Sequence, residues 1–250
     1  MNPDLIYKVA SGVATLTINR PAARNALNKA VRTGITAAIA DFSSDNSAKV
    51  LILTASGDKA FSAGADLKEM AELGMTIPPE DYLPTLKSEK PIIALVNGTA
   101  VGGGFYLVMQ ADLIIAAEHA TFGITEARYG RGAPWAAALP LLIAPKVAME
   151  MMLTGNLLSS HRALEIGLIN AVVPAANLMS EGQAIATQIA ANAPLTVAAG
   201  KKMVTAIMQK LLSDFQPVSN EIWRPVYLSK DAQEGPLAFS EKRPPNWLGK

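Results

Sequence analysis

The sequence predicts an α/β protein in which buried strands alternate with helices. Two continuous apolar runs, "VLILTAS" at 50–56 and "PIIALV" at 91–96, are typical of strands that are buried on both faces. A third run, "DLIIAA" at 112–117, has the same character. The first two runs are followed by turns of small residues that open into helical segments. This alternation indicates parallel strands joined by crossover helices.

The first elements of the chain are a hairpin and a helix. Residues 5–9 and 13–18 are strand-like runs joined by "ASG", which is typical of a β-hairpin. Asn28 has a side chain suited to capping a helix, which we expect to reach Phe42.

The later elements divide the chain into two regions. A short helix is expected at 66–73, and the proline-rich stretch 73–84 is expected to be a mobile loop. From residue 134 onward the pattern is mostly helical, with the strand "LINAVVP" as an interruption. We therefore expect an α/β core at 1–193 and a helical oligomerisation region at 194–250.

Composition and charge exclude several classes of function. A chain of 250 residues with 50% hydrophobic and 17% charged residues can bury a sizeable core. Its net charge of +1 provides no general attraction, so neither nucleic acid nor a membrane is expected as a partner. Without cysteine there are no disulfides or zinc–thiolate sites, and His119 and His161 lack the spacing of metal ligands. No signal peptide or apolar run of roughly 20 residues is visible, so a cytoplasmic protein is expected.

Three consecutive glycines, 102–104, stand at the start of a helical segment in "TAVGGGFYLVMQ". Glycine costs about 1 kcal/mol in a helix relative to alanine, so the run needs a reason. A tight strand-to-helix turn is one explanation, and it accounts for one or two glycines. The other is a bare backbone that lets a ligand approach amide groups at a helix N-terminus. The turn "SAGAD" at 62–66 repeats the arrangement, so each turn could direct one amide at a single oxygen.

Several ordered motifs resemble the enoyl-CoA hydratase/isomerase (crotonase) superfamily. They are "KAFSAGADLKEM", "KPIIALVNGTAVGGGFYLVMQADLIIAAEHATFGITEARYG" and "AMEMMLTGNLLSSHRALEIGLINAVVP", and the resemblance covers nearly the whole chain. It implies a crotonase-like spiral of ββα units with a helical C-terminal trimerisation region. It also implies a homotrimer or homohexamer that acts on an acyl-CoA thioester, with coenzyme A as part of the substrate and no separate cofactor.

The same resemblance implies roles for four residues. The backbone amides of Ala65 and Gly103 match an oxyanion hole for the thioester oxygen. A hydratase of this family handles water with two glutamates, and "FGITE" supplies one of them, Glu126. At the other position, in a G-G-G-x-E pattern, this chain has Tyr106. A phenol with a pKa near 10 can donate a hydrogen bond or act as an acid, but it is a poor base. The alternatives are that Tyr106 only forms a pocket wall and that Glu126 is an exposed loop carboxylate.

A second departure from the family pattern follows Glu126. A glycine-rich segment is replaced by "GRGAPWAAALP", in which Trp135 and several alanines indicate a reshaped acyl pocket. Arg128 and Arg131 either recognise a polar or carboxylated acyl group or are solvated surface residues. The resemblance implies contacts to substrate or coenzyme A from Arg24, Ala63, Asp66, Leu67 and Trp135. Asp66 is also expected to cap the helix that follows it.

The expected function is an acyl-CoA-processing enzyme that stabilises a thioester enolate and retains Glu126 as its single acid/base. Its nominal class is enoyl-CoA hydratase/isomerase, a lyase or an isomerase, although Tyr106 argues against ordinary hydration. The alternatives are a double-bond isomerase, dehydratase, decarboxylase or hydrolase of a special acyl-CoA, and a non-catalytic acyl-CoA-binding protein.

Overall fold

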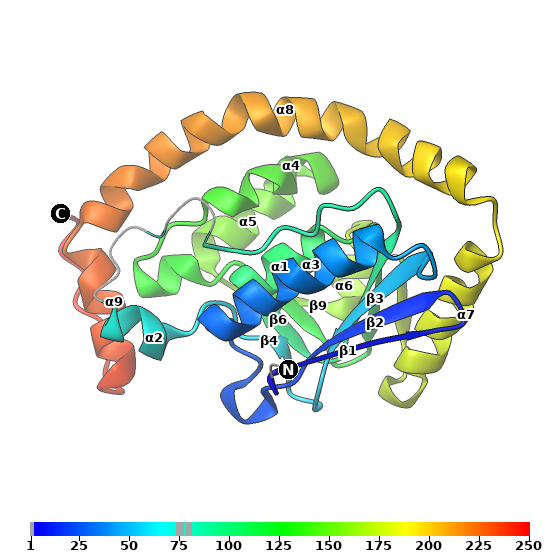
Figure 1. Ribbon diagram of the computed structural model, residues 1–250. Helices are drawn as coiled ribbons and strands as arrows, with labels where there is room; N and C mark the ends of the chain where they lie inside the picture. The colour runs from blue at the N-terminus through cyan, green and yellow to red at the C-terminus, as the bar shows by residue number, and fades with distance from the viewer. Residues whose placement is uncertain (1–2, 74–77, 79–81) are drawn as a thin grey trace.

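The computed structural model describes residues 3–73, 78 and 82–250, and two β-sheets lie at its centre (Figure 1). The larger sheet has the strand order β1-β2-β3-β5-β7-β10, and the smaller has the order β4-β6-β8-β9. β1 and β2 form the predicted antiparallel hairpin, and the other neighbours in the larger sheet are parallel. The strands of the larger sheet are β1 (Leu5–Ala10), β2 (Val13–Ile18), β3 (Val50–Ala55), β5 (Ile92–Val96), β7 (Leu113–Ala117) and β10 (Ala171–Val173).

The smaller sheet consists of short strands, three of which directly follow strands of the larger sheet. Its members are β4 (Ala60–Ser62), β6 (Thr99–Val101), β8 (Thr121–Gly123) and β9 (Leu158–Ser159). β4 follows β3, β6 follows β5 and β8 follows β7, and a helical segment comes after each pair. This repetition of a ββα unit confirms the crotonase-like spiral that the resemblance implied. The sequence did not predict the strand at Ala60–Ser62, because a three-residue strand is too short to show a periodic pattern.

The helices agree with the sequence expectations where those were specific. Asn28 caps α1, and its side-chain oxygen accepts a hydrogen bond of 2.9 Å from the Val31 amide. The predicted loop at 73–84 lies largely outside the described residues. The α-helices are α1 (Lys29–Ser44), α2 (Leu67–Glu72), α3 (Gly103–Met109), α4 (Leu139–Leu142), α5 (Pro145–Thr154), α6 (Ser160–Glu165), α7 (Leu178–Ala190), α8 (Pro194–Leu228) and α9 (Asp231–Ser240). Short 3-10 helices occur at Pro21–Ala23, Glu126–Tyr129, Pro134–Ala138 and Ala175–Asn177.

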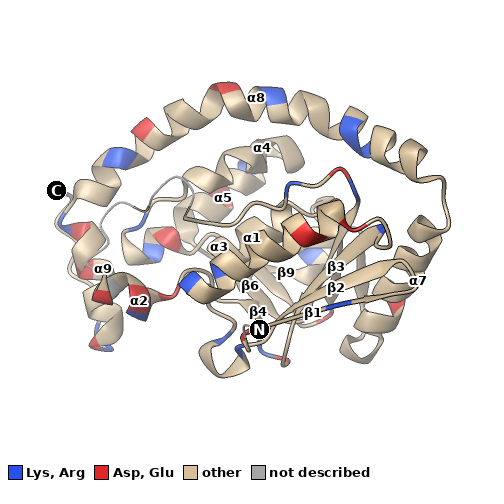
Figure 2. Ribbon diagram, viewed as in Figure 1, with Lys and Arg blue, Asp and Glu red and all other residues tan. Residues whose placement is uncertain are grey.

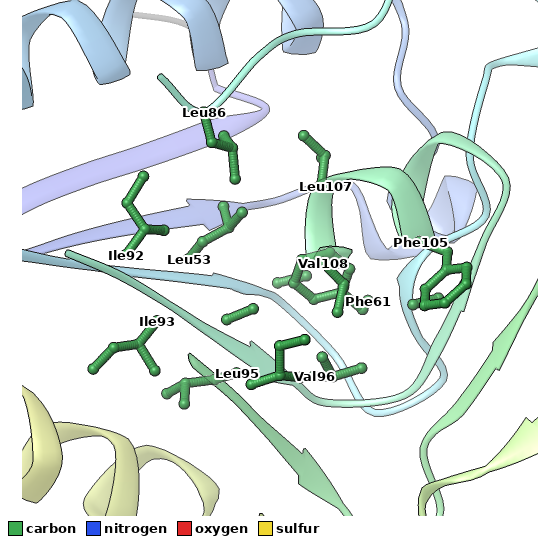
Figure 3. Packing of buried hydrophobic residues seen from close by; sticks show 14 of the residues in the cluster. Leu53, Phe61, Leu86, Ile92, Ile93, Leu95, Val96, Phe105, Leu107 and Val108 are labelled. Carbon is green, nitrogen blue, oxygen red and sulfur yellow. The ribbon is translucent and has the colours of Figure 1, made fainter. Parts of the chain in front are cut away.

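The hydrophobic core fixes the strand ends from which the site is built. Every residue of β3 and β5 is buried, as expected for strands covered on both faces. Phe105, Leu107 and Val108 of α3 are fully buried and belong to the same cluster as these strands (Figure 3). Burying one such side chain contributes about 1.5–3 kcal/mol. The start of α3 is therefore held firmly against the sheets.

The long helix α8 arches over the side of the molecule that carries α4 and α5 (Figure 1). It begins at Pro194 and contains Pro217 and Pro225 in its interior. An internal proline removes a helical hydrogen bond and bends the helix, which suits the arched path.

Polar contacts tie α8 to the rest of the molecule. The Lys201 ammonium lies 2.7 Å from the Asp112 carboxylate near the beginning of the arch. Further along, the Ser219 hydroxyl donates a hydrogen bond of 3.1 Å to the Pro134 carbonyl. Figure 2 shows that charged residues of both signs are dispersed over the elements, and those on α8 are widely spaced. No helix of the described residues is long and apolar enough to span a lipid bilayer.

Candidate active site

The two turns of small residues predicted from the sequence lie in direct contact. A methyl group placed on Gly64 would be 2.9 Å from the Val101 carbonyl oxygen and 3.0 Å from the Gly103 nitrogen. A methyl group on Gly103 would be 3.7 Å from the Ala65 nitrogen. The amides of Ala65 and Gly103 therefore belong to one small patch of backbone.

The three glycines have three different structural reasons. Gly102 adopts φ +55° and ψ −131°, a conformation that L side chains rarely adopt. Gly103 faces the Ala65 turn, and Gly104 packs so closely on Ser62 that a methyl group would overlap the Ser62 carbonyl. A tight turn thus explains Gly102, the neighbouring Leu83 and Leu27 side chains limit the space at Gly103, and close approach of backbone to backbone explains Gly104.

The amides at this patch lie at the beginnings of two helices. Gly103 is the first residue of α3, and Ala65 precedes Asp66, which comes directly before α2. The first amides of a helix have no hydrogen-bond acceptor inside it, and the helix dipole stabilises negative charge placed beside them. Such a pair can stabilise an anionic oxygen.

A buried asparagine holds the turn that carries Ala65. The Asn25 side chain accepts a hydrogen bond of 2.9 Å from the Arg20 amide and donates to the carbonyls of Ser56 and Ala60 at 3.0 and 2.7 Å. The Ser62 hydroxyl donates to the Asn25 carbonyl at 2.8 Å. The turn at the end of β4 is therefore fixed by side chains and not only by its small residues.

Two of the residues expected to contact coenzyme A have structural roles here. Asp66 accepts hydrogen bonds from the Lys68 and Glu69 amides, which confirms that it caps α2, and it forms an ion pair of 3.1 Å with Arg20. Arg24 is exposed, and its carbonyl accepts a hydrogen bond of 2.9 Å from the Ala63 amide. Neither Asp66 nor Arg24 lines the adjoining cavity, whereas Ala63 does.

A cavity of about 1790 Å³ opens beside the two turns. Of the residues singled out from the sequence, it is lined by Ala63, Ala65, Leu67, Gly103, Tyr106, Glu126, Arg131 and Trp135. The opposite wall comes from α8, including Gln216, Asn220 and Tyr227. This wall could not be predicted from the sequence, because α8 follows Glu126 by more than 60 residues and carries no motif that points to the site.

Glu126 lies beside the glycine turn. A methyl group on Gly102 would be 3.5 Å from Glu126 Oε1, so this carboxylate is next to the patch that contains Gly103. Oε1 accepts a hydrogen bond of 3.1 Å from the Trp135 indole N–H. Oε2 is buried and has no hydrogen-bond partner among the described residues. Burial raises the pKa of Glu126 from its usual 4.5 to about 7, against the opposing effect of its hydrogen bonds. The alternative of an exposed loop carboxylate is therefore excluded.

Tyr106 lies on α3, one turn beyond the glycines, and lines the cavity. Its amide donates a hydrogen bond of 3.0 Å to the Gly102 carbonyl. Its ring is 6.0 Å from that of Trp135, at an interplanar angle of 55°. Burial raises the pKa of the Tyr106 phenol, so the hydroxyl is protonated at neutral pH. It can act as a hydrogen-bond donor but not readily as a base.

The two arginines after Glu126 have different surroundings. Arg128 is exposed and donates a hydrogen bond of 2.7 Å to the Asn156 side chain. Arg131 is only 8% exposed, and its guanidinium lies 5.2 Å from the centre of the Tyr227 ring. The alternative of a solvated surface residue is therefore wrong for Arg131, because α8 covers it.

The two histidines are not close to this cavity, and metal ligation is not indicated. His119 lies exposed on a turn after β7, and His161 lies exposed at the start of α6. No group of three or more histidine, aspartate or glutamate residues suited to hold a metal ion occurs among the described residues.

Comparisons with known proteins agree with this geometry. The sequence profile described as enoyl-CoA hydratase/isomerase matches residues 8–250. A probable mitochondrial enoyl-CoA hydratase of Dictyostelium discoideum is 38% identical over 248 residues, which cover 95% of this chain and 88% of that protein. A carnitinyl-CoA dehydratase of Salmonella paratyphi A is 36% identical over 252 residues and 95% of both chains.

Solved structures extend the comparison to three dimensions. A carnitinyl-CoA hydratase of Mycobacterium avium matches with a TM-score of 0.90 and 35% identity over 99% of each chain. An enoyl-CoA hydratase of Mycobacterium tuberculosis matches with a TM-score of 0.82 and 35% identity, and the match covers 90% of this chain and 100% of that one. Two converging glycine turns, a buried glutamate beside them and these matches over nearly the full length lead to one conclusion: the chain belongs to the enoyl-CoA hydratase/isomerase family.

Proposed function

We propose that this protein is a hydratase- or lyase-type enzyme that converts acyl-CoA thioesters through an enolate, with Glu126 as its acid/base. The observation that carries the proposal is the position of the Glu126 carboxylate beside the Ala65–Gly103 patch, at one cavity. Relatives named enoyl-CoA hydratase and carnitinyl-CoA dehydratase support this class of reaction.

The amides of Ala65 and Gly103 act on the thioester oxygen. When the α-proton leaves, the electron pair of the C–H bond moves toward that oxygen, which becomes an enolate. Preorganised donors of this kind contribute about 2.7–4 kcal/mol each to stabilising such a charge. The contact between the two turns keeps both donors in place before the substrate arrives.

Glu126 carries the proton. As a carboxylate it accepts the α-proton, and as a neutral acid it returns a proton to carbon or to a departing β-hydroxyl, which then leaves as water. A pKa of about 7 suits both steps, because each protonation state is then populated near neutral pH. Tyr106 supplies a donor in place of a second carboxylate. The reaction as written uses no cofactor other than the coenzyme A carried by the substrate.

The remaining candidate residues shape the binding site. Ala63 and Leu67 line the cavity next to the oxyanion patch, and Trp135 forms its acyl wall. Arg24 and Asp66 hold the turn beneath the thioester, through the Ala63 amide and the start of α2. Their effect on coenzyme A is therefore through the position of the turn.

Association into a homotrimer or homohexamer completes the proposal. One face of α8 exposes apolar side chains to solvent, namely Met203, Val204, Ile207, Leu211, Phe215 and Val218. An exposed apolar surface of this extent is suited to contact with another copy of the chain. Light scattering should give a molar mass of three or six chains, and Ile207→Asp should lower it. A monomeric mass for the unchanged protein would contradict this part.

Incubation with saturated and 3-hydroxyacyl-CoA thioesters in heavy water tests the chemistry. Mass spectrometry should detect deuterium at the α-carbon, and Glu126→Gln should abolish its incorporation while thioester binding persists. Tight binding of a broad set of thioesters without any exchange would instead identify a non-catalytic binding protein. The same screen, extended to enoyl- and dicarboxylyl-CoA, identifies the preferred acyl group.

A further inference from the structure

The carboxylate of Glu126 has two oxygens in different surroundings. Oε1 accepts the hydrogen bond of 3.1 Å from Trp135 Nε1. Oε2 is buried and has no hydrogen-bond partner among the described residues. Oε1 is also the oxygen that would lie 3.5 Å from a methyl group on Gly102. The indole therefore holds the carboxylate at the oxygen that lies beside the glycine turn.

The indole that donates to Oε1 is held from several directions. The Trp135 ring packs edge-on to Phe105, with centroids 6.3 Å apart at 89°, and it contacts Tyr106 at 6.0 Å. The backbone beside it is fixed by the hydrogen bond from Ser219 to the Pro134 carbonyl. Because Phe105 is fully buried, the indole has little freedom to turn away from Glu126.

We propose that Trp135 is the positioning residue of Glu126: its N–H binds Oε1 and so holds the carboxylate beside the Ala65–Gly103 patch, where the carboxylate takes and returns the substrate proton. This inference rests on the proposed function. In the forward step the α-C–H bond breaks, an O–H bond forms at the carboxylate, and the electron pair moves to the thioester oxygen. The reverse step restores the carboxylate, so no further reactant is needed.

The indole N–H also affects the charge of the carboxylate. A hydrogen bond donated to a carboxylate favours the ionised form, and here it opposes the effect of burial. Other titratable side chains also line the cavity, namely Tyr82, Lys87, Glu89, Tyr106, Asp112, Tyr129, Arg131, Lys201, Lys202, Glu221, Arg224 and Tyr227. A change confined to Trp135 leaves all of them in place, so a shift in the titration of Glu126 can be assigned to the lost hydrogen bond.

Trp135→Phe removes the N–H donor and keeps an aromatic ring. In protein carrying 13C-labelled glutamate, the Glu126 carboxyl signal should titrate about one to two units higher in this variant. The signal is identified by its loss in Glu126→Gln. The pH midpoint of kcat/KM for α-proton exchange should rise by the same amount, while thioester affinity changes less than threefold. Trp223→Phe, the same substitution at a residue of α8 that does not line the cavity, should leave both midpoints unchanged.

Each result separates this inference from the proposed function. If the unchanged protein exchanges the α-proton but Trp135→Phe leaves both midpoints unshifted, the positioning role is overturned. If the unchanged protein exchanges no proton with any thioester, the proposed function fails, and the catalytic part of this inference fails with it. In that case a raised carboxyl pKa in the variant would still establish the hydrogen bond. Trp135→Met, which also lacks the donor, provides the same comparison if the phenylalanine variant does not fold.

Discussion

Gly104 lies directly against the carbonyl group of Ser62, and this contact joins the start of α3 to the end of β4. A methyl group at Gly104 would overlap backbone that cannot move alone. At Gly103 it would meet the ends of the Leu83 and Leu27 side chains, at 2.8 and 3.3 Å, which can shift. Neighbouring glycines thus differ in what they tolerate.

Alanine at Gly104 should therefore lower mainly the stability of the fold, whereas alanine at Gly103 should lower mainly the rate of the reaction. We expect Gly104→Ala to lower the free energy of unfolding by about 3 kcal/mol or more. Gly103→Ala should change it by only about 1 kcal/mol, yet slow α-proton exchange by at least about tenfold, because the methyl group faces the Ala65 amide. Urea unfolding and the exchange assay measure both quantities. Equal stability of the two variants would contradict this account of the glycines.

Asn25 should be among the most sensitive polar residues of the chain. Asn25 is 1% exposed. The three hydrogen bonds of its side chain join the Arg20 amide, after β2, to the carbonyls of Ser56 and Ala60, between β3 and β4. Asn25→Ala leaves buried backbone groups unpaired and also places alanine at φ +55°. We expect a loss of about 3 kcal/mol or more in thermal or chemical unfolding. Thr33→Ala, on an exposed part of α1, should lose less than about 1 kcal/mol.

The raised pKa of Glu126 makes stability depend on pH in a defined direction. Between its usual pKa of 4.5 and its folded value of about 7, the folded chain binds a proton that the unfolded chain does not. The free energy of unfolding contributed by this group is therefore highest below pH 4.5 and falls as pH rises to 7.

Glu126→Gln removes that dependence. Above pH 7 it should be more stable than the unchanged protein by up to about 3 kcal/mol, and near pH 4 the two should be alike. Urea unfolding across this range, with Glu150→Gln on the exposed face of α5 as the control, measures the difference. A constant difference at all pH values would mean that the carboxyl is ionised normally.

Tyr106→Phe tests whether the phenol takes part in the chemistry. If its hydroxyl donates to the reacting group, removal should lower kcat about tenfold or more and leave KM within about threefold. The ring contact with Trp135 is retained, so the pocket wall is preserved. Unchanged kcat would assign Tyr106 to the wall alone.

Tyr106→Glu tests the departure from the hydratase pattern. It places a second carboxylate on α3, at the same cavity as Glu126. If this variant hydrates crotonyl-CoA faster than the unchanged protein does, the residue at position 106 is what limits hydration. Tyr106→Gln, of similar shape without a charge, should gain none. If neither variant gains activity, the altered segment around Trp135 is the remaining cause.

The larger sheet could be predicted because the residues of its strands themselves form recognisable apolar runs. β3 and β5 are continuous apolar runs, and the Asn28 cap follows from one side chain. The smaller sheet was missed because its strands have two or three residues and are defined by pairing with distant segments. The partition at residue 194 stays a prediction, although α8 begins at that point, and so does the cytoplasmic location.

The candidate site was predictable where backbone chemistry dictated residue type. Gly102 and Gly104 had to be glycine, and the turn that contains Ala65 had to be small. The hydrogen bond from Trp135 to Glu126 was not predictable, because it depends on two successive 3-10 turns that bring residues nine positions apart together. The burial of Arg131 was equally hidden, since the element that covers it lies far along the chain.

The wall supplied by α8 has a consequence for the order of events during synthesis. Tyr227 donates a hydrogen bond of 2.9 Å to the Gly132 carbonyl, so the segment between Glu126 and Trp135 is secured by a residue 95 positions further along the chain than Gly132. Both sheets can assemble earlier, because their strands end at Val173. The nascent chain can therefore form both sheets before α8 is available to complete the wall of the cavity.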